Sequence, residues 1–164
     1  MTGSGVPSSR RPIGRGRTLV CVVLLLATGR AIAFTPEQAE YGAWVLRRQC
    51  ARCHGGDGQG KDDAWKGLRA PELIGAGAFP LEPRPYQQIR RRDFRSVLDV
   101  FWFVSASMPA DQPASLEPEE YWSVLAFLLR SNGMAPDGTP LADATADQIP
   151  MPHLAAHPPG KAGP

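Results

Sequence analysis

Two cysteines and a histidine lie within five consecutive residues, in a Cys-x-x-Cys-His pattern at residues 50–54. Thiols three residues apart on a helical turn face the same way, and this spacing suits covalent attachment of haem. Each thiol can add across a vinyl group of the macrocycle, while the adjacent imidazole is placed to bind the iron. The motif therefore predicts Cys50 and Cys53 as haem attachment points and His54 as the proximal iron ligand.

Two other kinds of site use a cysteine pair of this spacing. A thioredoxin-like dithiol requires a surrounding βαβ pattern, which the sequence lacks. A zinc site needs two more ligands, and His153 and His157 do have finger-like spacing. However, 99 residues separate Cys53 from His153, against about 12–15 in the finger pattern. The sequence therefore favours haem, and we expect both histidines to be solvated.

A six-coordinate iron needs a second axial ligand besides His54. The candidates after the motif are Met108, Met134, Met151, His153 and His157. Met108 is favoured because it ends an amphipathic segment and is followed by a proline, which stops the helix and places the thioether on a fixed loop. A thioether ligand raises the reduction potential of the iron. We therefore predict His54 and Met108 as the axial metal ligands.

The 164 residues are enough for one domain with a single core. They are 43% hydrophobic and 21% charged and carry a formal net charge of +2. Five of the 18 basic residues precede residue 34, where no acidic residue occurs, so the rest of the chain has 13 basic against 16 acidic side chains. That part carries a net charge of −3, which disfavours a nucleic-acid-binding protein because such a protein needs a basic face.

Residues 1–33 have the pattern of a cleaved signal peptide. Arginines between residues 10 and 17 form a positive region, residues 19–27 are apolar, and residues 31–33 form a small-x-small cleavage site. An uncleaved anchor is the alternative, but the apolar run is roughly half of the ~20 residues that a membrane span needs. We therefore expect a mature N-terminus at Phe34, a periplasmic protein and no membrane span after cleavage. Loss of Cys21 leaves one cysteine pair, so no disulfide framework can stabilise the fold.

Helical signals occur in three segments of residues 34–133, which predicts an all-α fold. Thr35 can cap the first helix, with Gln38 placed to close a capping box, and Asp93 can cap the second. The centre of the third is apolar nearly all round, so it must be covered on more than one side. The three predicted helices are residues 35–50, 93–108 and 118–132.

The remaining segments are irregular. Residues 55–84 are dense in Gly, Pro, Asp and Lys and show neither strand alternation nor a helical period, which indicates a stretch that wraps something functional. Residues 134–164 contain ten Pro or Gly and are predicted to be an extended tail. A large apolar macrocycle would complete the core. The fold prediction is therefore three main helices and long loops wrapped around one covalently bound haem.

These features resemble a class I c-type cytochrome over roughly residues 36–133. In that family a glycine and an apolar residue before the first cysteine pack on the terminal helix. The corresponding residues here are Gly42 and Leu46, and their partners resemble Val124 and Phe127.

A second part of the resemblance concerns Pro71, within Ala70-Pro71-Glu72-Leu73. This segment is similar to the family's Pro-x-Leu segment, in which the proline carbonyl accepts the N–H of the haem-binding histidine. The resemblance implies that Pro71 orients His54 and raises its basicity. The preceding residues, 61–69, read as an insertion relative to the family.

The resemblance implies a periplasmic monohaem cytochrome c that passes single electrons from a dehydrogenase to a respiratory acceptor, such as a terminal oxidase or another cytochrome. Residues 94–127 look like small cytochromes that serve periplasmic dehydrogenases, including quinoprotein alcohol dehydrogenases. Such a carrier is not an enzyme. Two alternatives stay open: a haem enzyme with an open sixth position, and a dedicated cytochrome subunit of a periplasmic oxidoreductase complex.

Other side chains give weaker signals. The arginines at 90–92 and Arg95 would steer an acidic partner, meet the haem propionates or form a solvated face. Three aromatic residues, Trp65, Tyr86 and Trp102, would line the haem pocket.

Overall fold

The computed structural model describes residues 1–3, 34–84 and 90–151. The expected leader cleavage site, Tyr86 and the two tail histidines lie outside the described residues. Along the described chain the elements are α1 (Pro36–Gln49), α2 (Ala51–His54), β1 (Lys61–Trp65), β2 (Leu68–Ala70), α3 (Val97–Ser107), α4 (Pro118–Ser131) and α5 (Asp143–Ala146). No helix of the described residues has the length and apolarity to cross a membrane.

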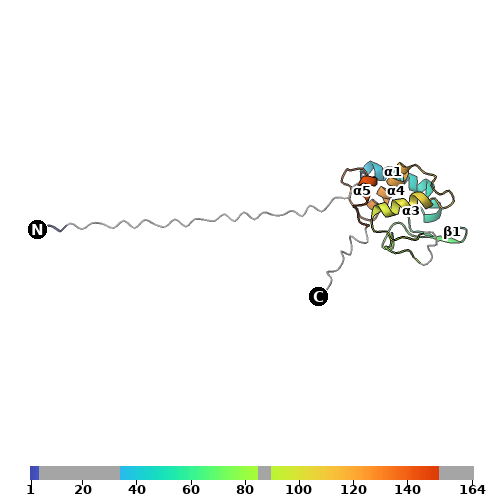
Figure 1. The fold of residues 1–164 in the computed structure, drawn as a ribbon, viewed down its shortest axis with the longest axis horizontal. Helices are drawn as coiled ribbons and strands as arrows, with labels where there is room; N and C mark the ends of the chain where they lie inside the picture. The colour runs from blue at the N-terminus through green and yellow to red at the C-terminus, as the bar shows by residue number, and fades with distance from the viewer. Residues whose placement is uncertain (4–33, 85–89, 152–164) are drawn as a thin grey trace.

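Helices α1 and α4 pack against each other more extensively than any other pair of described elements, and their contact lies at the centre of the core (Figure 1). Their backbones meet at Gly42, where an added Cβ would lie 1.7 Å from the carbonyl oxygen of Ser123. Beside this crossing, Leu46 and Val124 are 1% and 8% exposed. Glycine at position 42 is therefore required for this close approach, which agrees with the part of the resemblance that pairs Gly42 with Val124.

Two of the three predicted helix starts differ in detail from the structure, although Thr35 is the N-cap of α1 as predicted. Thr35 Oγ accepts the backbone N–H of Gln38 at 3.1 Å, but the Gln38 side chain closes no capping box and bonds to the backbone of Leu141 instead. Helix α3 is capped by Ser96 with Asp99, three residues after the predicted Asp93. Ser96 prevails because Asp99 bonds back to its N–H, whereas Asp93 pairs with Arg95.

The predicted all-α fold is incomplete, because residues 61–70 form a small antiparallel hairpin of β1 and β2. Its two-residue turn, Lys66-Gly67, has positive φ at both positions, as a type I′ turn requires. Lysine is an unusual residue there, and the strands contain no β-branched residue, so the local sequence carries little hairpin signal. The segment predicted as an insertion is thus an ordered hairpin at the edge of the molecule (Figure 1).

The segment from 134 to 151 also differs from the predicted extended tail, because it folds back on the core. Leu141 and Met151 are each 1% exposed. The N–H of Val97 donates to the carbonyl of Ile149 at 3.0 Å, at the start of α3. The buried apolar residues of this segment stand singly in the sequence and follow no period. Composition alone therefore does not reveal that the segment packs on the core.

Candidate haem site

The cysteine pair and His54 lie on the single turn of helix α2. The N–H of His54 donates to the carbonyl of Cys50 at 2.9 Å, so the three side chains occupy positions i, i+3 and i+4 of one face. Gly55 ends the turn with φ 79°, a left-handed conformation that favours glycine. The local backbone thus presents two thiols and an imidazole together.

Both cysteines are free thiols. Burial, and to a smaller extent the neighbouring Cys53, raises the pKa of Cys50 to about 11. The Sγ of Cys53 lies 3.6 Å from the carbonyl of Ala64 on β1. Among the described residues no group of three or more His, Cys, Asp or Glu side chains is arranged to hold a metal ion.

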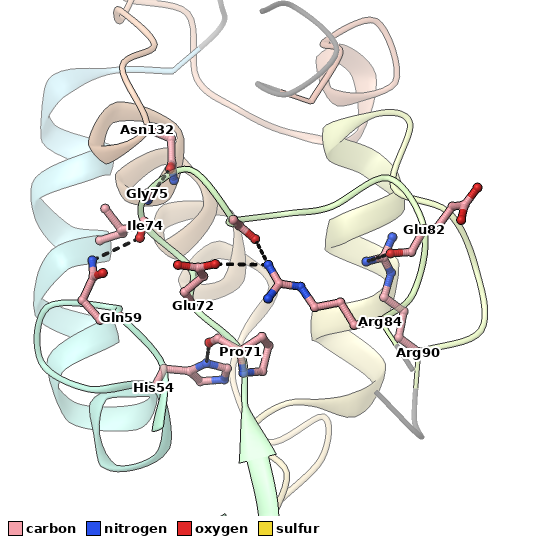
Figure 2. A network of polar contacts seen from close by, with 11 residues as sticks. His54, Gln59, Pro71, Glu72, Ile74, Gly75, Glu82, Arg84, Arg90 and Asn132 are labelled. Atoms are coloured by element: carbon pink, nitrogen blue, oxygen red, sulfur yellow. Dashed lines mark hydrogen bonds and ion pairs between the residues drawn. The ribbon is translucent and has the colours of Figure 1, made fainter. Parts of the chain in front are cut away.

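His54 is 9% exposed, and its Nδ1 lies 2.8 Å from the carbonyl oxygen of Pro71 (Figure 2). Because a carbonyl only accepts, Nδ1 carries the proton and donates, which leaves the Nε2 lone pair available. Burial lowers the pKa of His54, and the bond to Pro71 opposes that shift. The imidazole is therefore held neutral and in the tautomer that suits a metal ligand.

The carbonyl of Pro71 is positioned by contacts on both sides. Strand β2 leads directly into it (Figure 2), and an added Cβ at Gly60 would lie 2.6 Å from the carbonyl of Ala70. Further along, Asn132 at the end of α4 donates to the carbonyl of Leu73 at 2.9 Å and accepts from the N–H of Gly75 at 3.0 Å. Sequence analysis identified Asn132 only as a helix end, because its tie to this loop is a long-range contact.

One cavity brings the predicted site residues together. Cys50, Cys53, His54, Pro71 and Met108 all line it. The rest of the wall is mainly apolar and includes Trp65, Leu68, Phe79, Phe94, Val100, Phe103, Val104, Val124, Leu125 and Leu128.

Three other residues considered for the site lie outside the cavity wall. Trp102, predicted to line the pocket, is 61% exposed instead, because it is on the outer side of α3. Met134 and Met151 are buried in the core but do not belong to the cavity wall of the described residues. Of the described methionines, Met108 is the one that the cavity wall contains.

Met108 follows the last residue of α3 and is tied in place by Tyr121. The Tyr121 hydroxyl donates to the Met108 carbonyl at 2.7 Å and accepts the N–H of Leu116 at 3.4 Å. Burial raises the pKa of Tyr121, so the phenol stays protonated and remains a donor. An ion pair between Asp111 and Arg52 connects the same loop to the cysteine turn. Sequence analysis missed Tyr121, whose role depends on contacts 5 and 13 residues away.

The donor set and the wall fit haem c. Two free thiols and a neutral imidazole share a face, a thioether lines the same space, and the remaining wall is apolar enough to cover a macrocycle.

A solved structure described as the sulfane dehydrogenase SoxCD from Paracoccus pantotrophus matches at a TM-score of 0.49 and 26% identity. The match covers 77% of this chain and 64% of that chain, so our chain spans less than two thirds of its length. No curated protein sequence matches.

A family model described as cytochrome c oxidase, cbb3-type, subunit III matches residues 37–128, more than half of the chain. This region contains the cysteine turn, the hairpin, α3 and nearly all of α4. The chain therefore belongs to this family: it is a class I c-type cytochrome with a cytochrome c-like fold, and it carries haem c and transfers electrons.

Proposed function

We propose that this protein is a periplasmic one-electron carrier with a single haem c. In this proposal Cys50 and Cys53 hold the haem covalently, and His54 and Met108 are the axial ligands. The observation that carries the proposal is that one cavity of mainly apolar lining contains all four side chains together with Pro71. When bound, the haem supplies an iron that alternates between ferric and ferrous states.

The imidazole has the features that a proximal ligand needs. Its Nδ1–H bond to Pro71 fixes both the tautomer and the ring orientation, and such a bond increases ligand basicity. Because the pKa of His54 is lowered by burial, no proton competes for Nε2 near neutral pH.

Met108 meets the other requirement of a carrier, which is a second axial ligand that stays in place. Its backbone is bonded to Tyr121, and the loop after it is paired to Arg52 through Asp111. A ligand held this way keeps the iron environment nearly unchanged between oxidation states, which favours fast electron transfer over turnover at the iron.

Export and partners belong to the same proposal. The pattern of residues 1–33 supports cleavage after Ala33 and a periplasmic location. In this compartment the protein would accept electrons from a dehydrogenase and deliver them to a respiratory acceptor. The family description names an oxidase subunit, which favours a second candidate: a dedicated cytochrome subunit of an oxidoreductase complex.

Optical spectra with and without carbon monoxide test the carrier function. The ferric wild type should show a sulfur-to-iron band at the red edge, and the ferrous form should exclude carbon monoxide. Met108→Leu should lose the band and bind carbon monoxide. The matched control Met134→Leu removes a thioether that does not line the cavity and should behave as wild type.

Two outcomes would contradict the proposal. A wild type without the band that binds carbon monoxide has an open sixth position, as a haem enzyme requires. A band that survives in Met108→Leu would mean that another side chain is the ligand. Constant stoichiometric co-purification with one enzyme would instead favour the subunit candidate over a diffusing carrier.

A further inference from the structure

The outer face of helix α1 carries two exposed aromatic side chains. Tyr41 and Trp44 are 45% and 44% exposed, whereas Val45 on the opposite face of the helix is fully buried in the core. The two rings are stacked, with their centroids 5.7 Å apart and an angle of 15° between their planes. An exposed cluster of large apolar side chains, unlike a single one, marks an interaction surface. The outer face of α1 is therefore a candidate surface for binding a partner.

Two exposed charged residues extend the aromatic pair along the helix, one at each end. Glu37 lies four residues before Tyr41, and Arg48 lies four residues after Trp44. The guanidinium carbon of Arg48 is 4.8 Å from the centroid of the Trp44 ring. Spacings of four, three and four residues place all four side chains on one line along the helix surface. We call these four residues the α1 outer stripe.

The two charges of the α1 outer stripe are too far apart to pair within the helix. Glu37 and Arg48 are separated by 11 positions, whereas side chains on one helix meet at three or four positions. None of the ion pairs between described residues includes either of them. The helix dipole accounts for an acid in the first turn and a base in the last turn. It gives no reason for exposed aromatic rings between them.

The α1 outer stripe is complementary to itself when the helix direction is reversed. The spacing of four, three and four residues is the same in both directions. A second α1 laid antiparallel on the first therefore places Glu37 of each copy opposite Arg48 of the other. Tyr41 of each copy then meets Trp44 of the other at the centre. A contact with two-fold symmetry needs such a surface, because the same patch serves both copies.

We propose that the α1 outer stripe is the interface of an antiparallel homodimer, so that its partner is a second copy of this chain. Two ion pairs between Glu37 and Arg48 flank two aromatic contacts between Tyr41 and Trp44. Tyrosine, tryptophan and arginine are the residue types that dominate the binding energy of interfaces. A dimer of this kind goes beyond the proposed carrier function and does not depend on the axial ligands of the iron.

The geometry of α1 also sets the strength and the layout of the dimer. The helix has 14 residues and is about 21 Å long, so the contact is small and the dimer should be weak and reversible. Each cysteine turn directly follows the C-terminal end of its own α1. Antiparallel pairing therefore places the two haem sites at opposite ends of the interface.

Sedimentation of the haem-loaded protein tests the dimer by charge exchange. The wild type should change from monomer to dimer mass as its concentration rises from about 1 μM to about 1 mM. Glu37→Arg and Arg48→Glu should each remain monomeric, because each variant brings like charges together at both ends of the interface. An equimolar mixture of the two variants should recover the dimer, because each end of the mixed interface again joins an acid to a base.

Glu119→Arg is the matched control. Glu119 is likewise an exposed acidic residue in the first turn of a 14-residue helix, α4. The substitution changes the net charge and opposes the helix dipole as Glu37→Arg does, but it should dimerise as the wild type does. The far-ultraviolet circular dichroism of each variant reports whether it is folded, independently of the iron ligands.

Three results would overturn the proposal. The first is a wild type that stays monomeric up to about 1 mM, also if Glu37→Arg then loses co-purification with another protein, which would make that protein the partner of the stripe. The second is a wild-type dimer that both single variants also form, because its interface would lie elsewhere. The third is a mixture of folded variants that stays monomeric.

The dimer and the carrier function fail separately. Each result above concerns molecular mass, so it leaves the carrier function standing. A wild type that dimerises but lacks the sulfur-to-iron band would defeat the proposed axial ligation and support the dimer.

Discussion

Two regions enclose the cavity: the α1–α4 pair and the loop wall, by which we mean residues 55–84 and 90–96. They are held together by different kinds of contact. The helix pair is held by direct backbone contact at Gly42 and by side chains such as Leu46, which is 1% exposed. Outside the β1–β2 hairpin, the loop wall is held largely by separate hydrogen bonds, such as that from the N–H of Leu73 to the carbonyl of Gly58 at 2.7 Å. We therefore expect the helix pair to keep more of its structure than the loop wall when the cavity is empty.

The largest effect is expected from removing both attachment points. The double variant Cys50→Ala/Cys53→Ala should lose all covalently retained haem, because no other thiol lines the cavity among the described residues. The mass of the denatured protein measures this directly. Arg47→Ala, an exposed change on α1, is the control and should keep the haem.

The same variant tests whether the helix pair and the loop wall depend equally on the haem. Hydrogen exchange in the haem-free protein should accelerate strongly in the loop wall and less in α1 and α4. An unchanged haem-bearing mass would refute the attachment points. Equal loss of protection in both regions would show that the helix pair also depends on the haem.

The next largest effect is expected from Gly42→Ala. The new methyl group would lie 1.7 Å from the Ser123 carbonyl oxygen, and a backbone atom cannot move aside as a side chain can. The unfolding free energy should fall by about 3 kcal/mol or more, measured by denaturant titration. Gly56→Ala is the matched control, because an added Cβ there meets nothing within 4 Å. Equal stability of the two variants would mean that the helix pair is not closely packed.

A smaller loss is expected from Leu141→Ala, which tests whether residues 134–151 belong to the core. Leu141 is 1% exposed and its backbone is bonded twice to the Gln38 side chain. Its truncation should cost about 2–4 kcal/mol of unfolding free energy. Thr139→Ala, an exposed change in the same segment, should cost less than about 0.5 kcal/mol. If both variants are as stable as wild type, the segment contributes nothing to the fold.

The smallest effect is expected from Tyr121→Phe, which removes the hydroxyl between Met108 and Leu116. The loss of these hydrogen bonds should cost about 1 kcal/mol. On heating, the sulfur-to-iron band should disappear at a lower temperature than in wild type. Tyr41→Phe, at a 45% exposed position, is the control. An unaltered melting curve of the band would show that Tyr121 does not hold the Met108 loop.

The same contrast explains what sequence could predict. Periodic apolar residues and the cap at Thr35 indicate the helices because their signals are local, and helices α1, α3 and α4 lie within a few residues of the predicted segments. The spacing of the cysteines and histidine in residues 50–54 is itself specific for haem attachment, so the cysteine turn could also be predicted from sequence.

The missing parts depend on contacts between distant residues. The hairpin turn uses Lys66, which carries no turn signal of its own. The segment around Leu141 is buried although its apolar residues follow no periodic pattern. Arg90 belongs to a run of three arginines whose pattern is that of a solvated face. Only the fold shows that one of the three lines a cavity and is buried.

The central claim is that His54 and Met108 hold one iron across this cavity. Proton NMR of the reduced protein with labelled methionine methyl groups tests it most directly, because a methyl group bound over the macrocycle is shifted far upfield by the ring current. The account predicts one such signal among the three methionines of the mature protein, Met108, Met134 and Met151, present in Met134→Leu and absent in Met108→Leu. A shifted signal that survives in Met108→Leu, or no shifted signal in the wild type, would contradict it.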